Sequence, residues 1–105
     1  MRRCSIKGID GGPSGLWIEA KRESPGEADL FLGHAKGGRF IAHVSHAQLH
    51  SAWLSRRGIP AGEVEIFFEA DRNDYRLDYQ PSRGPDHGLR LWVGRDDLEL
   101  LVGRE

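Results

Sequence analysis

The chain has 105 residues, of which 38% are hydrophobic and 30% are charged, and its formal net charge is -1. This composition is typical of a folded domain and not of a disordered chain, so we expect one globular domain over residues 1–105. A dedicated nucleic-acid binder relies on excess lysine and arginine to contact phosphates. The near-neutral charge therefore argues against a nucleic-acid partner.

The single cysteine, Cys4, cannot form an internal disulfide or a cysteine-based zinc site. A chain without disulfides suits a reducing compartment. No apolar run approaches the roughly 20 residues that cross a bilayer, and no hydrophobic signal region follows the basic residues at the start. We therefore expect a cytoplasmic protein with no membrane contact, in which Cys4 is a small buried residue near the start of a strand.

Glycine and proline divide the chain into short segments in which apolar and polar residues mostly alternate, as they do in half-buried strands. No internal repeat is evident. The alternation predicts strands over 3–9, 16–21, 29–34, 39–44, 63–71, 75–80 and 89–93.

The most secure hairpin joins the strands 63–71 and 75–80 through the turn at Asp71–Asp74, and Glu69 and Arg76 are placed to pair across it. The last segment, 96–102, fits two patterns. Alternate apolar residues favour a strand, whereas Leu98, Leu101 and Val102 fit a helical turn capped by Asp96 or Asp97. We favour the strand.

One helix is predicted with agreeing start and stop signals, over residues 46–57. Ser45 is a good N-cap, and Gln48 three residues later completes a capping box. Gly58 is expected to end the helix as its C′ residue, and Pro60 prevents it from restarting. The predicted fold class is α+β: a mostly antiparallel, curved sheet of about seven or eight short strands with this central helix packed on it.

A helical wheel places polar residues on the side of this helix that should face the core. The apolar direction is set by three residues, Leu49, Trp53 and Leu54. His46, His50 and Arg57 point close to the same direction. A core-facing position of a helix normally carries an apolar residue. We therefore interpret these three polar residues as a patch that contacts a partner or a ligand.

The spacing of His46 and His50, at i and i+4, would let one metal ion bridge the two imidazoles. His43 could supply a third nitrogen, which would leave an open position on zinc or another divalent metal. Strand alternation points His43 away from the predicted inner face, and no carboxylate lies in the segment. Purely structural or surface histidines are therefore the alternative.

Trp17, Phe31 and Trp92 fall on the outward parity of their strands. Such aromatics are core if the sheet folds into two layers, and otherwise they mark an interface. The outward face of the strand 63–71 is acidic, so it is expected to face water or a basic partner.

These features lead to two hypotheses from different classes. The first is a small non-enzymatic protein-interaction module of the inhibitor, immunity or regulatory type, acting through a sheet face or edge and the helix, with a protein partner or a second copy of the chain. The second is a small histidine-dependent enzyme or metal-binding module built around His43, His46 and His50, joined by His34 or His87. A third hypothesis is a sheet-lined pocket for a small ligand. No catalytic motif is evident, and we favour the first hypothesis.

Overall fold

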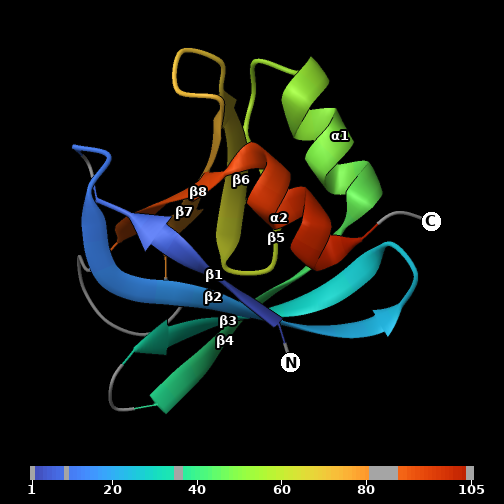
Figure 1. Cartoon of the computed structure of the whole chain (residues 1–105). Helices are drawn as coiled ribbons and strands as arrows, with labels where there is room; N and C mark the ends of the chain where they lie inside the picture. Colours follow the sequence, from blue (N-terminus) through green and yellow to red (C-terminus); the bar gives the residue numbers. More distant parts are fainter. Residues whose placement is uncertain (1, 9, 35–36, 81–87, 104–105) are drawn as a thin grey trace.

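The computed structural model describes residues 2–8, 10–34, 37–80 and 88–103, without the side chains of residues 2, 23 and 34. Within these residues, eight strands and two short helices follow one another (Figure 1). They are β1 (Arg2–Lys7), β2 (Pro13–Ser24), β3 (Glu27–His34), β4 (Gly37–Ser45), α1 (His46–Leu54), β5 (Ile59–Ala61), β6 (Val64–Glu69), β7 (Asp74–Tyr79), β8 (Leu89–Gly94) and α2 (Arg95–Val102).

All eight strands form one antiparallel sheet in the order β4-β3-β2-β1-β8-β7-β6-β5. The predicted antiparallel sheet is thus confirmed, whereas the prediction of a single helix is wrong. The predicted hairpin is present as β6 and β7, and the Arg76 guanidinium lies 2.6 Å from the Glu69 carboxylate. The short strand β5 was not predicted.

Each half of the chain is a four-stranded meander followed by one helix. β1 to β4 lead into α1, β5 to β8 lead into α2, and the pairing of β1 with β8 joins the two halves. Leu49 and Leu98 are the fourth residues of α1 and α2, and both are fully buried. The fold therefore contains a structural repeat that the sequence does not reveal.

The sheet curls until its two edge strands, β4 and β5, come into contact. The turn after β5 makes this approach: a side chain at Gly62 would lie 3.4 Å from the carbonyl oxygen of Ile41. Gly62 also has a φ of 60°, which favours glycine. The backbone conformation therefore favours glycine here, at the point where the two edges of the sheet meet.

The helices lie side by side on one face of the sheet and contact each other (Figure 1). That face carries the core, which draws on both halves of the chain. Its largest fully buried aliphatic side chains are Ile18, Leu30, Ile41, Val44, Leu49, Ile66, Leu77, Leu91, Val93, Leu98 and Val102. Neither helix is long and apolar enough to cross a membrane.

The start of α1 is as predicted, but its end is not. Ser45 caps the helix through a capping box with Gln48, as expected. The helix ends at Leu54, because Ser55 already has an extended backbone. Gly58 lies beyond this end, where a side chain would collide with the Phe67 ring and the Glu65 carboxylate. Close packing against β6, and not helix capping, explains this glycine.

The prediction of a strand over 96–102 is wrong, because these residues belong to α2. Leu98, Leu101 and Val102 are buried together on one side of the helix. The tertiary fold also fixes α2 at Glu99, whose carboxylate oxygen accepts a hydrogen bond from the Tyr75 hydroxyl at 3.0 Å. Tertiary contacts thus decide between two patterns that the local sequence leaves open.

A bulge in β4 changes the residue facing the core. Leu30 pairs with Ala42 and Phe31 pairs with Phe40, so Ile41 is the extra residue. Ile41 is 1% exposed, whereas Phe40 is 51% exposed. Simple alternation over 39–44 would put Phe40 on the inner face with Ala42, and this expectation is wrong because of the bulge.

Candidate interaction surfaces

The three histidines of the predicted metal site do not converge. His43 lies on the outer face of β4, bonded to carboxylates of β3. The ring of His50 lies instead against Trp53, with 5.9 Å between centroids. No group of three metal-binding side chains is found among the described residues. His87 lies outside these residues, and so does the side chain of His34.

His43 contacts two carboxylates on the outer face of the sheet. Its Nδ1 atom lies 2.8 Å from an Asp29 carboxylate oxygen, and its Nε2 atom lies 3.4 Å from Glu27. Hydrogen bonds to Asp29 and then to Glu27 raise the pKa of His43 above its ordinary value. These contacts engage both ring nitrogens of His43, so this histidine is held as part of an ionic cluster.

The helical-wheel prediction for α1 is right for Leu49, which is fully buried, and wrong for Trp53 and Leu54, which are exposed. The helix buries Leu49 and Ala52, and it leaves Trp53 and His50 exposed. Arg57 lies beyond the helix and is also exposed, while His46 is half-buried at the first position. Trp53 and Leu54 lie in the last turn of the helix, beside the end of β6.

Trp17 lies flat on the outer face of the sheet, held by three neighbours. Its indole ring covers Gly33, where any side chain would collide with it. Its Nε1 atom donates a hydrogen bond of 3.0 Å to Glu19, and the Arg3 guanidinium lies 5.2 Å from the ring centroid. The half-buried Trp17 ring is therefore fixed in one position.

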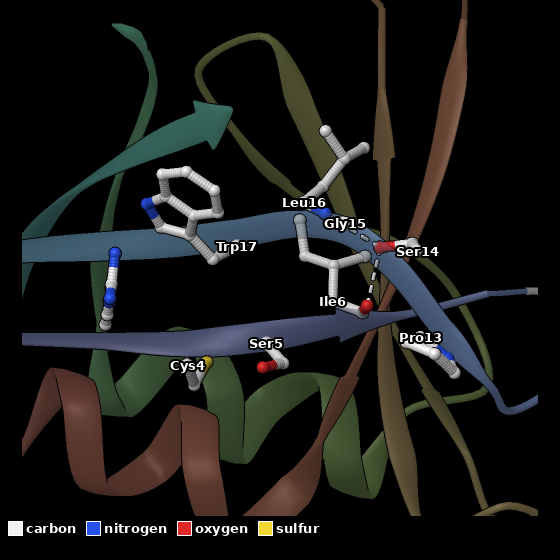
Figure 2. A pocket seen from close by; sticks show the side chains of 9 residues that line it. Cys4, Ser5, Ile6, Pro13, Ser14, Gly15, Leu16 and Trp17 are labelled. Atoms are coloured by element: carbon white, nitrogen blue, oxygen red, sulfur yellow. Dashed lines mark hydrogen bonds between the residues drawn. The ribbon is translucent and has the colours of Figure 1, made fainter. Parts of the chain in front are cut away.

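A hollow of 420 Å³ adjoins Trp17 where the pairing of β1 with β2 is irregular. Figure 2 shows Trp17 on one side of the two strands and Cys4 on the other, and the Ser14 hydroxyl donates to the Ile6 carbonyl oxygen at 2.6 Å. Burial, with the nearby Asp97 carboxylate, raises the pKa of the Cys4 thiol to about 12. A thiol in this state is a poor nucleophile, so the hollow has no reactive cysteine.

Trp92 and Phe31, the other two outward aromatics, differ in their surroundings. Trp92 is only 9% exposed, because the guanidinium groups of Arg72 and Arg76 lie over its ring at 4.0 and 5.8 Å from the centroid. Phe31 is half-buried and meets the exposed Phe40 edge to face at 5.7 Å. Trp92 is thus covered within the chain, whereas Phe31 and Phe40 form a small apolar pair on the outer face of β3 and β4.

A groove of 470 Å³ separates the end of α1 from β6. It is lined by Trp53, Leu54, Ser55, Arg56, Arg57, Phe67, Phe68, Glu69 and Ala70. Of these residues, only Arg57 belongs to the predicted site. We call this feature the α1–β6 groove.

The apolar wall of the α1–β6 groove is aromatic. The Trp53 and Phe68 rings meet edge to face at 6.5 Å, and the Arg95 guanidinium lies 4.7 Å from the Trp53 centroid. Leu54 beside them is 68% exposed, the highest value among the large hydrophobic residues described. These apolar side chains are held in position by their neighbours and still face solvent.

The charges of the α1–β6 groove are unbalanced. Glu69 is paired with Arg76 at 2.6 Å. The exposed guanidinium groups of Arg56 and Arg57 have no ion pair or hydrogen bond among the described residues. The groove therefore presents two free positive charges beside an exposed apolar wall.

Comparison with protein-family models, with curated proteins and with solved structures finds no match to this chain. The site must therefore be judged from its own chemistry.

Proposed function

We propose that this protein is a small non-enzymatic protein-interaction module of the inhibitor, immunity or regulatory type, and that it binds its partner through the α1–β6 groove. The observation that carries the proposal is the combination in one groove of the exposed Trp53 and Leu54 with the unpaired Arg56 and Arg57. Tryptophan and arginine contribute most to binding energy at protein interfaces, particularly when neighbouring contacts hold them in position.

The Trp92 surface on the outer face of the sheet supports this choice of site by contrast. Trp92 is covered by Arg72 and Arg76, and Arg76 is neutralised by Glu69 and Asp78. Such a surface has already satisfied its charges within the chain and offers little to a partner. The α1–β6 groove, in contrast, presents the unpaired guanidinium groups of Arg56 and Arg57.

The proposal is tested by selecting binders from an unbiased library of displayed 12-residue peptides. Selected peptides should bind the unaltered protein and lose at least about tenfold in affinity for Leu54→Ala, as expected for an interface residue of high contribution. Leu100→Ala is the matched control, because Leu100 is 66% exposed on α2 and does not line the groove. The proposal is wrong if no selected peptide distinguishes the two variants.

A further inference from the structure

The main chain of β6 has an open edge inside the α1–β6 groove. β5 pairs with β6 only from Ile59 opposite Ile66 to Ala61 opposite Val64. Along the opposite edge of β6, β7 pairs with it as far as Glu69. The last three residues of β6, Phe67–Glu69, therefore have a neighbouring strand on one side only.

The register shows which main-chain groups face this open edge. The amide of Gln80 donates to the carbonyl oxygen of Glu63 at 2.9 Å, so Glu63 directs its main-chain groups toward β7. Main-chain groups of successive residues in an antiparallel pair point alternately to the two sides. Because β6 and β7 pair without a bulge, Phe68 directs its N–H and C=O groups away from β7, into the groove.

Pro60 provides an independent check of this register. Ile66 has the same parity as Phe68, so it bonds to Ile59 on the β5 side, and Glu65 faces β7. Pro60 pairs with Glu65, at a position where β5 needs no N–H donor. The chain then leaves the sheet before Arg57 can pair with Phe68, which leaves the Phe68 groups free for another strand.

We infer, on the basis of the proposed function, that the α1–β6 groove binds a short acidic segment of a partner protein as an added strand beside Phe67–Glu69. The main chain of the segment would exchange hydrogen bonds with Phe68, as in other cases of strand addition to a sheet edge. Directly paired residues lie on the same face of a sheet, so the residue opposite Phe68 would be apolar and would pack beside Trp53 and Leu54.

The apolar residue opposite Phe68 would be the anchor of the bound segment. The charges of the groove indicate which residues should flank it. Arg56 and Arg57 carry the unpaired positive charges, and the only carboxylate lining the groove, Glu69, is bound to Arg76. Carboxylates flanking the anchor would therefore find free guanidinium groups, which bind them in a bidentate manner. A nucleic acid is disfavoured, because an extended polyanion needs a long row of cations, and the groove offers only the two unpaired guanidinium groups of Arg56 and Arg57.

The composition of the selected peptides tests the acidic segment. The peptides selected above should carry an apolar residue flanked by aspartate or glutamate. Charge reversal in the double variant Arg56→Glu, Arg57→Glu should lower their affinity by at least about tenfold and shift a new selection toward lysine. Arg90→Glu is the control, because Arg90 is similarly exposed and lies outside the groove.

Strand addition is tested with the same peptides. Methylating the peptide nitrogens one at a time should abolish binding at alternate positions only, and the Phe68 amide should show a strong chemical-shift change and slowed hydrogen exchange. Peptides that need Leu54 but show no acidic excess, or tolerate every methylation, overturn this inference and leave the proposed function intact. Binding of an oligothymidylate in place of the peptides, with the same dependence on Arg56 and Arg57, also overturns it.

Discussion

The Nζ atom of Lys7 lies 2.8 Å from a carboxylate oxygen of Asp74, 67 residues away in the sequence. Asp74 is 2% exposed, and it is the only fully buried charged residue among those described. Arg72 approaches its second oxygen at 3.1 Å. This cluster ties β1 to the start of β7 across β8, and thus holds together the two halves of the sheet.

Lys7→Met should destabilise the protein, because it leaves the buried carboxylate with fewer cationic partners. We expect the free energy of unfolding to fall by about 1–3 kcal/mol, the usual cost of a buried polar group that loses a partner. Urea denaturation should show a lower midpoint with an unchanged slope.

Arg90→Met is the matched control for Lys7→Met. Arg90 lies 3.9 Å from Asp78 with its side chain 65% exposed, so its loss should cost less than about 0.5 kcal/mol. Equal effects of the two variants would contradict the importance of the Lys7–Asp74 contact.

Gly33→Ala should displace Trp17, whose indole ring occupies the space that a side chain at position 33 needs. Overpacking of this kind costs about 1–3 kcal/mol. Gly38→Ala is the control. Gly38 lies in β4 opposite Gly33, and a side chain there would meet nothing closer than 3.7 Å. In a Trp17→Ala background the cost of Gly33→Ala should largely disappear, which a double-mutant cycle in urea would measure.

The start of α1 and the central hairpin could be predicted because their determinants are local. Ser45 and Gln48 lie three residues apart and form the capping box by themselves. From Val64 to Tyr79, alternate residues define the two faces of the hairpin, and a short turn joins its two strands directly. In such segments the nearest neighbours in sequence are also the contacts in space.

The remaining features depend on residues that are distant in sequence. The buried face of α1 depends on where β6 lies, since the sheet covers Leu49 and Ala52 but not Trp53. The helical state of α2 depends on its packing and on Tyr75, 24 residues before its partner Glu99. The open edge at Phe68 depends on the length of β5, a three-residue strand with too few residues for a periodic signal. The α1–β6 groove is made by all these contacts together, so only its Arg57 was selected from the sequence.

The His43 cluster should make stability depend on pH. Because Asp29 and Glu27 raise the pKa of His43 in the folded state, its stabilisation is fully present below the unfolded-state pKa of about 6.5. The stabilisation is lost as the pH rises through the higher folded-state value. The melting temperature of the unaltered protein should therefore exceed that of His43→Gln more at a pH of about 6 than at about 9.

Asp29→Asn provides the control for the His43 cluster, because Asp29 makes the shortest contact. In an Asp29→Asn background, the difference in melting temperature caused by His43→Gln should depend less on pH. An advantage of His43 that grows with rising pH would contradict the sign argued here.

Cys4 should be slow to react in the folded protein. Burial, assisted by Asp97, raises the pKa of its thiol to about 12, so very little thiolate exists at a pH of about 8. A thiol-specific disulfide reagent should therefore modify Cys4 at least about 100-fold more slowly in buffer than in concentrated urea, where the ordinary pKa of about 8.5 returns. Asp97→Asn should increase the folded-state rate only slightly, because burial is the larger cause of the shift. α2 packs against β1 next to Cys4. If Cys4 reacts equally fast with and without urea, this side of β1 is open to solvent and that packing is wrong.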